Sequence, residues 1–356
     1  MKNLKPFFLV IFLSVLLYGF FLQSCSKGAT VENRTDTTVV SSVIPADSLY
    51  KIVYFLTESA NQSVGAFLQE RALQATNLTC VNYFPTVNMD ASGNISPMTA
   101  GENSDWNILL STGKTDGFKV LYSFHQQMDN MRPILQDSNI QANLIGQLYA
   151  LQQSLGGAGM DFDIEYPASD ADTKLLGGFF KNLRAKMGNN VVITADVGPK
   201  SYTQSSLGHV EGYVVNDYLN WVNVMCYGAG ANNSFNAMTA AVGEYQNKQV
   251  NRYKIVIGLP YFAVVHYVNT TGQTVAFNPA YSYLVNNVGA TDFTTDSLPY
   301  NMNGANPNYL LFNSPADIEA KAKFAKAFGG VMAWHWRADV LGTHSLTDAI
   351  VKGKNE

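Results

Sequence analysis

The chain has 356 residues, of which 47% are hydrophobic and 14% are charged, and its formal net charge is −4. Such a composition can bury a large core, and the absence of a basic stripe interleaved with aromatic residues argues against a nucleic-acid partner. Beyond the N-terminal segment only Cys80 and Cys226 remain, both in apolar stretches. We therefore expect two buried thiols rather than a disulfide framework.

The N-terminus resembles a bacterial lipoprotein signal peptide. Lys2 and Lys5 precede an almost unbroken apolar run over residues 7–22, and the run ends in Leu-Gln-Ser-Cys, which resembles the lipobox. We expect residues 1–25 to be a signal peptide, with Cys25 lipidated and the protein anchored to a membrane of the cell envelope. The alternative is an uncleaved membrane anchor, because about 20 apolar residues can span a bilayer.

Residues 26–46 are rich in Ser and Thr without a helical period, which is typical of a flexible tether. One domain is then expected over residues 47–352, where short β-branched runs alternate with helical patterns. The predicted strands are Tyr50–Phe55, Thr79–Phe84, Phe118–Phe124, Gly159–Glu165, Val191–Asp196, Trp221–Tyr227, Lys254–Pro260 and Gly330–Trp336. The predicted helices are Val64–Gln74, Asn139–Leu155, Asp172–Met187, Phe235–Gln246 and Pro315–Phe328.

Eight strand-then-helix units predict an α/β fold of the (β/α)8 TIM-barrel type, with site residues at the C-terminal ends of the strands. The competing fold is a doubly wound open sheet, which usually has a Gly-rich turn after its first strand, and residues 57–60 are not such a turn. An insertion at about 264–308 separates the last two strands and shows no clear helical pattern. The insertion either forms one side of a cleft or is an ordinary surface loop.

The fourth predicted strand carries the most informative pattern. Two sets alternate along it, the apolar Met160, Phe162 and Ile164 and the acidic Asp161, Asp163 and Glu165. Strand side chains alternate between faces, so the three acids share one face at ~6.6 Å intervals. In a barrel they point into the mouth, where lost hydration and mutual repulsion raise at least one pKa and keep a proton available for acid catalysis.

A structural role and a metal site are the alternatives to catalysis for this strand. A structural amphipathic edge strand would carry polar residues of mixed type rather than three acids. A calcium-binding loop would need Gly at its sixth position, where Tyr166 stands, and polar residues where apolar ones occur. We therefore favour catalysis and expect no metal at this site.

Residues 159–167 resemble the fourth-strand motif of family 18 glycoside hydrolases, the chitinases and endo-β-N-acetylglucosaminidases, which reads Asp-Gly-x-Asp-x-Asp-x-Glu. The matching residues are Gly159, Asp161, Asp163 and Glu165. Four weaker matches occur in the family's order, at Lys119–Ser123, Val224–Tyr227, Ile257–Tyr261 and Gly330–Trp334. The resemblance covers most of residues 50–340 and implies a barrel enzyme acting on glycans that contain N-acetylglucosamine.

The resemblance also implies roles for individual residues in a reaction in which the substrate supplies its own nucleophile. Glu165 would be the general acid and base, Asp163 would orient the acetamido group, and Asp161 would share a proton with Asp163. Tyr227 would bind the acetamido oxygen, and Trp334 would lie under the reacting sugar. The remaining expected substrate-binding residues are Tyr54, Phe84, Met225 and Ser123, the last also as a hydrogen-bond partner of Asp161.

Three positions depart from the family pattern. Ala158 replaces an Asp, Gly228 replaces the Asp that follows the Tyr of the sixth-strand motif, and His125 follows Phe124 where the family has Gly-Gly. We interpret His125 either as a sugar-contacting group or as a solvated loop residue.

The departures keep two other functions open. One is a non-catalytic surface glycan-binding protein, and the other is a hydrolase that uses two ordinary carboxylates. In each case we expect a monomer without a cofactor.

Overall fold

The structure is a computed structural model that describes residues 50–57, 61–227, 234–268, 274–287, 296–300 and 308–356. The expected signal peptide with Cys25, the tether, Gly228 and parts of the 264–308 insertion lie outside these ranges. Within the described ranges, no helix combines the length and apolar character needed to cross a membrane.

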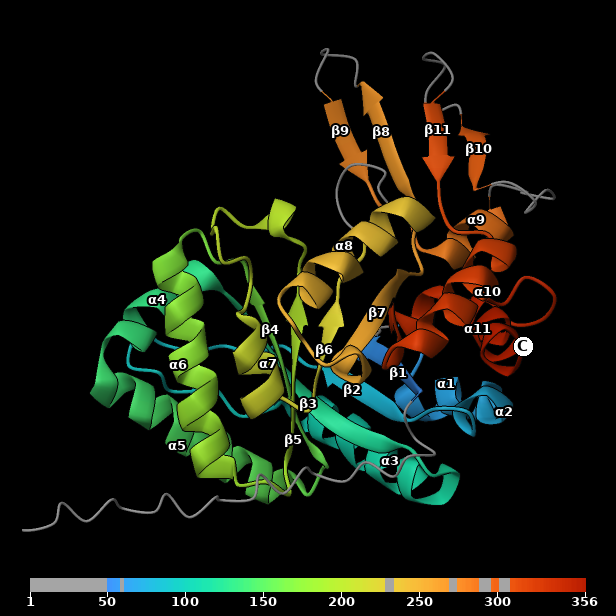
Figure 1. Cartoon of the computed structure of the whole chain (residues 1–356). Coiled ribbons are helices and arrows are strands. Elements are labelled where there is room, and N and C mark those ends of the chain that lie inside the picture. The colour runs from blue at the N-terminus through green and yellow to red at the C-terminus, as the bar shows by residue number, and fades with distance from the viewer. Residues whose placement is uncertain (1–49, 58–60, 228–233, 269–273, 288–295, 301–307) are drawn as a thin grey trace, which may run out of the picture. The chain divides into compact units, whose positions relative to one another are not determined.

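Eight parallel strands close into a barrel in the order β1-β12-β7-β6-β5-β4-β3-β2 (Figure 1). They are β1 (Lys51–Thr57), β2 (Cys80–Phe84), β3 (Lys119–Gln127), β4 (Gly159–Glu165), β5 (Val192–Val197), β6 (Trp221–Val224), β7 (Ile255–Pro260) and β12 (Gly330–Trp334). All eight predicted strands are present, which confirms the TIM-barrel fold and excludes the open sheet. The most consequential difference is at β3, which runs past its predicted end at Phe124.

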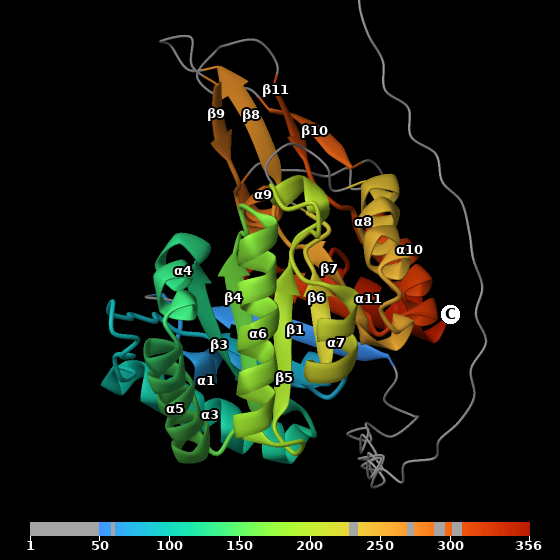
Figure 2. The ribbon, with the colours of Figure 1, turned by 60° about the vertical axis from the view of Figure 1, so that its left-hand side comes forward.

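Helices cover the outside of the barrel (Figures 1 and 2). They are α1 (Val64–Glu70), α2 (Ala72–Ala75), α3 (Ala100–Asp116), α4 (Met128–Gln136), α5 (Ser138–Leu155), α6 (Asp170–Met187), α7 (Gly212–Tyr218), α8 (Phe235–Asn247), α10 (Pro315–Phe324) and α11 (Leu346–Asn355). The sequence did not predict α3, α4, α7 and α11. In α3 only a narrow apolar stripe is buried, and its start is fixed by a capping box between Thr99 and Glu102 rather than by periodicity.

The two faces of β4 have different environments. Its apolar residues belong to the layer between barrel and helices, where the Phe162 ring lies 5.6 Å from Phe179 and 5.8 Å from Phe180 of α6. The first residue of the strand is Gly159. A larger residue would not fit there, because β5 approaches so closely that a Cβ would lie 1.9 Å from the carbonyl oxygen of Val192. The acidic residues therefore face the barrel interior, as the alternation predicts.

The interior of the barrel is closed below the acids by apolar side chains. Val53, Leu121, Trp221 and Val256 are all buried there in one cluster. Cys80 lies in the same cluster and Cys226 in the outer layer, and both are buried free thiols, which confirms the expectation from the sequence. The barrel is thus filled at one end, and only its other end is available for a site.

The insertion between β7 and β12 is more regular than its sequence suggests. It contains β8 (Val264–Val268), β9 (Thr274–Phe277), β10 (Ser297–Tyr300) and β11 (Asn308–Leu311), in a four-stranded sheet of order β10-β11-β8-β9 (Figure 2). It also contains α9 (Tyr281–Asn287), so the expectation of no helix in this segment is wrong. The helix is short and has no acidic residue in its first turn, so it carries little of the signal on which sequence prediction depends.

Candidate active site

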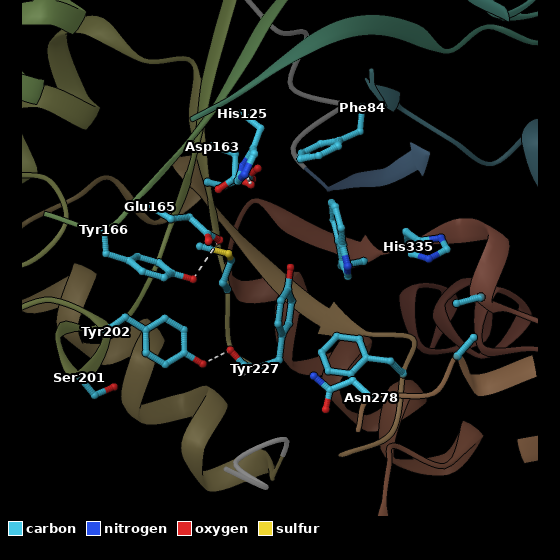
Figure 3. A pocket seen from close by; sticks show the side chains of 16 residues that line it. Phe84, His125, Asp163, Glu165, Tyr166, Ser201, Tyr202, Tyr227, Asn278 and His335 are labelled. Carbon is cyan, nitrogen blue, oxygen red and sulfur yellow. Dashed lines mark hydrogen bonds and ion pairs between the residues drawn. The ribbon is translucent and has the colours of Figure 1, made fainter. Parts of the chain in front are cut away.

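A cavity of about 1000 Å³ opens at the C-terminal end of the barrel strands. Its lining residues come from most of the barrel strands and the loops after them. They are Phe84, His125, Asp163, Glu165, Tyr166, Asp196, Ser201, Tyr202, Met225, Tyr227, Phe262, Asn278, Ala280, Trp334, His335 and Ala338. Asn278 and Ala280 belong to the insertion, which supports its interpretation as a wall of the cleft. Figure 3 shows the carboxylates and aromatic rings around this space.

The strand register sets which side chains meet inside the barrel. Asp163 of β4 pairs with His125 of β3 and with Asp196 of β5, so these three residues form one layer. Asp161 lies one layer deeper, where its partners are Ser123 and Thr194. In a parallel sheet, residues in register project to the same side, and this geometry brings several carboxyl groups together.

Asp161 is completely buried and fully hydrogen-bonded. Its Oδ2 accepts from Ser123 Oγ at 3.0 Å, and its Oδ1 accepts from Thr194 Oγ1 and from Asn223 Nδ2, the latter at 3.2 Å. Burial raises the pKa of Asp161 to about 6, against the effect of these donors. Ser123 does not line the cavity, so the expectation that it contacts substrate is wrong, and its role as partner of Asp161 is confirmed.

Asp163 lies between Asp161 and the open cavity and is 6% exposed. Its Oδ2 is 3.0 Å from His125 Nδ1, whereas its Oδ1 is buried without a hydrogen-bond partner among the described residues. His125 lies on β3 because the strand is longer than predicted, so its interpretation as a solvated loop residue is wrong. The hydrogen bond to Asp163 raises the pKa of the imidazole above its usual value.

Glu165 ends β4 and lines the cavity (Figure 3). Its Oε1 accepts a hydrogen bond of 3.0 Å from the hydroxyl of Tyr166. Burial raises the pKa of Glu165, and the nearby Asp163 raises it further. A carboxyl that holds its proton and faces an open space is suited to general acid catalysis.

Asp196 is a fourth carboxyl at this site, and sequence reasoning missed it. It is 3% exposed, lines the cavity and accepts a hydrogen bond of 2.9 Å from Asn223 Nδ2. Burial and the neighbouring Asp161 raise its pKa well above the usual range. The signal was present, because Asp196 was the last residue of a predicted strand and active-site residues of barrels lie at such ends.

Aromatic rings form the opposite side of the cavity from the acids. Trp334 meets the edge of Phe84 at 5.0 Å and lies 5.3 Å from Phe55. Tyr227 meets Phe262 edge to face at 5.6 Å, and its hydroxyl is 3.7 Å from Met332 Sδ. The expected residues Trp334, Phe84, Tyr227 and Met225 therefore all line the cavity, as do Glu165 and Asp163.

Tyr54 is the clearest error of the sequence prediction. It is fully buried on the outer face of β1, where it stacks on Trp336 at 5.2 Å and hydrogen-bonds Tyr261 at 3.0 Å between hydroxyls. The interior position belongs to its neighbour Phe55. All but the last residue of β1 are buried, so no polar alternation marks which face is which.

Several lining residues had no strong sequence signal. Tyr166 directly follows Glu165, whereas Tyr202 comes from the loop after β5, and its hydroxyl donates a hydrogen bond to the backbone carbonyl of Tyr227. His335 follows Trp334, and burial together with nearby Arg337 lowers its pKa to about 4. The described residues contain no group of three or more His, Cys, Asp or Glu side chains arranged to hold a metal ion.

Comparison with known families and structures adds to this geometry. The profile described as Glycosyl hydrolases family 18 matches residues 51–339. Sequence comparison with curated proteins finds no match.

Three solved structures have a similar fold. The C-terminal domain of a putative chitinase from Desulfitobacterium hafniense is 16% identical with a TM-score of 0.73, over 85% of this chain and 99% of that one. A chitinase from Bacteroides thetaiotaomicron is 19% identical with a TM-score of 0.67, over 86% and 96%. A chitinase-like agglutinin from Robinia pseudoacacia is 17% identical with a TM-score of 0.69, over 85% and 98%.

Proposed function

The chain belongs to the glycosyl hydrolases of family 18, and we propose that it is a retaining enzyme that cleaves β-1,4 bonds of N-acetylglucosamine in chitin-type oligosaccharides or N-glycan cores. The observation that carries this proposal is the carboxyl row of β4. Asp161 is buried at its base, Asp163 lies above it, and Glu165 opens into the cavity with a raised pKa. A row of acids in a closed barrel destabilises the fold, so its presence supports a chemical role.

In the first step Glu165 donates its proton to the glycosidic oxygen while the bond from that oxygen to the anomeric carbon breaks. The carbonyl oxygen of the substrate's own acetamido group forms the new bond to that carbon, and an oxazolinium ion results. In the second step the Glu165 carboxylate takes a proton from water, whose oxygen attacks the same carbon and reopens the ring. Two inversions at one carbon leave the configuration retained.

The neighbouring residues stabilise this intermediate. Asp163 is buried, and the charge of its carboxylate would offset the positive charge of the oxazolinium ion. Asp161 and Asp196 lie close below and beside it, and their raised pKa values allow protons to redistribute between them when that charge changes. Tyr227 lines the cavity, and among the described residues its hydroxyl donates only to Met332 Sδ, a weak acceptor that the acetamido oxygen can replace. Trp334 offers a ring face for a sugar.

Replacement Glu165→Gln tests the assignment of the acid. The amide keeps the size and loses the proton, so we expect the release of reducing ends from chitooligosaccharides or N-glycoproteins to fall by about 10²–10⁴-fold. Glu70→Gln, at the exposed C-terminal end of α1, is the matched control and should keep full activity. Full activity of Glu165→Gln at unchanged thermal stability would contradict the proposal.

A thiazoline analogue of the oxazolinium ion separates the possible mechanisms. A substrate-assisted enzyme should bind this neutral mimic more tightly than its substrate, because the analogue resembles the intermediate. A hydrolase that uses two ordinary carboxylates would cleave sugars without the acetamido group and would not be inhibited. Glycan binding without turnover by the wild type would instead support a lectin, as in the structurally similar agglutinin.

We also propose that Cys25 carries a lipid that anchors the enzyme to the cell envelope. The support is the sequence alone, which places Cys25 after Leu-Gln-Ser at the end of an apolar run. Expression with a labelled fatty acid should label the wild type and not Cys25→Ser. Equal labelling of both proteins would show that this cysteine is not the lipidation site.

A further inference from the structure

His125 is a feature of the cavity that the proposed mechanism does not yet use. It projects from β3 directly opposite Asp163 in the strand register, with Nδ1 3.0 Å from Asp163 Oδ2. Its other side contacts Phe84 of β2, with ring centroids 5.3 Å apart. The imidazole is therefore held between a carboxylate and an aromatic ring, while 36% of the side chain remains exposed to the cavity.

The charges around the cavity make His125 unusual. Three carboxyls line the space and Asp161 lies below them, whereas His125 and His335 are the basic residues among the described lining residues. Because burial lowers the pKa of His335 to about 4, it is neutral near pH 7. His125 makes the one ion pair of these four carboxyls within the described ranges, so in its protonated form it supplies them with compensating positive charge.

The hydrogen bond between His125 and Asp163 also determines which oxygen of Asp163 is available to the substrate. Oδ2 is bound to His125, and Oδ1 is buried and lacks a hydrogen-bond partner in the described part of the chain. A buried acceptor without a donor is costly unless a ligand supplies one. The acetamido N–H of the expected substrate is such a donor, and it would reach a carboxylate whose orientation is already fixed.

We propose that His125 is a positioning residue, which holds the carboxyl of Asp163 through Oδ2 and leaves Oδ1 to accept the acetamido N–H of the substrate. This inference rests on the proposed function. Its chemical content is specific to this chain, because an apolar residue at position 125 would not fix Oδ2, and a neutral one would not balance the charge of the carboxyl row.

The charge of His125 also bears on the pH dependence of catalysis. The titratable neighbours of Asp163 are Asp161 and Glu165 on its own strand, Asp196 on β5, His125 on β3 and the neutral Tyr227. The titratable neighbours of His125 are Asp163 and Glu165. Positive charge on His125 lowers the pKa of Glu165, the proposed general acid. Catalysis needs Glu165 protonated, and loss of this proton sets the alkaline limb of kcat/KM.

Replacement His125→Asn tests this, because the amide nitrogen takes the place of Nδ1 and keeps the hydrogen bond without the charge. We expect the alkaline limb of kcat/KM on a chitooligosaccharide to move to higher pH, because the removed charge no longer lowers the pKa of Glu165. His125→Phe should show the same shift and, lacking the donor, a further fall in kcat.

His344→Asn is the matched control, because it alters a histidine that does not line the cavity and should leave the alkaline limb in place. Thermal unfolding of each variant shows whether the fold is intact. If His125→Asn and His125→Phe lower the rate by one factor at every pH, His125 only packs against its neighbours and the proposal is overturned.

An NMR titration of the His125 imidazole separates this inference from the proposed function. The pKa in the wild type should lie above 6.5 and should fall in Asp163→Asn. An unshifted value in the wild type overturns the ion pair. A shifted value in a protein that cleaves no glycan overturns the proposed hydrolase, and with it the positioning role of His125.

Discussion

The two faces of β4 show how one strand can serve two opposite purposes. The outer face carries Phe162 and its neighbours, which are packed against α6 and need no partner beyond other apolar groups. The inner face carries acids that burial and mutual repulsion hold away from their normal ionisation. The outer face stabilises the barrel. The inner face lowers this stability, because it buries carboxyl groups that would be ionised in water.

Phe162→Ala is expected to give the largest effect and to act on stability alone. Loss of the ring leaves a cavity between β4 and α6, which costs about 3–5 kcal/mol of the free energy of unfolding. Urea unfolding measures this cost, and kcat of the remaining folded protein should be unchanged. Leu73→Ala, at a site 87% exposed, should cost less than about 0.5 kcal/mol. A large fall in kcat for Phe162→Ala would mean that the two faces are not independent.

Asp196→Asn tests how the buried carboxyls of the inner face affect the free energy of unfolding as the pH changes. Because the pKa values of Asp161 and Asp196 are raised, these two carboxyls bind more protons in the folded protein than in the unfolded chain above pH 4. Their contribution to the free energy of unfolding should therefore decrease as pH rises from about 4 through the folded pKa values. The lowered pKa values of the buried His209 and His335 act in the opposite direction, so the test is the difference between wild type and variant.

In Asp196→Asn one of these groups no longer ionises, so this decrease should be smaller than in the wild type. Thermal unfolding between pH 4 and 8 measures it. The pKa of Asp170 is instead lowered to about 2 by the Ser206 and Ser205 hydroxyls, so Asp170→Asn should alter the slope only below pH 4. Equal slopes for wild type and Asp196→Asn would show that Asp196 ionises normally.

Tyr166→Phe removes the donor to Glu165 and leaves the acid in place. The hydrogen bond orients the carboxyl and favours its ionised form. Its loss should lower kcat by about 10-fold, which corresponds to about 1.4 kcal/mol, and should move the alkaline limb of kcat/KM to higher pH. Tyr213→Phe, on the exposed surface of α7, serves as the control. An unmoved alkaline limb would count against Glu165 as the group that sets it.

Tyr54→Phe should have the smallest effect and checks the corrected orientation of β1. It removes a hydroxyl that hydrogen-bonds Tyr261 outside the barrel. We expect a loss of about 1 kcal/mol in the free energy of unfolding. The values of KM and kcat for a chitooligosaccharide should be unchanged. A raised KM would place Tyr54 in contact with substrate after all.

The barrel and the acidic face of β4 could be predicted from the amino-acid sequence. Eight β-branched runs with helical patterns between several of them have few compact solutions, and a strict alternation of apolar and acidic residues fixes the orientation of β4. Ser314 and Pro315 likewise predicted the start of α10, because capping depends only on nearby residues. These features were readable because their causes are local or periodic.

The set of side chains that meet at the site became visible in the folded protein and could not be predicted from the sequence. Asp196 and His125 join Asp163 because three strands are held in one register, a relation between segments that no local pattern contains. The orientation of β1 was also decided by packing, because both of its faces are buried and only the closed barrel places Phe55 inside and Tyr54 outside. Hydrogen bonds and pKa values depend on such long-range neighbours and on burial, and both arise only when the chain folds.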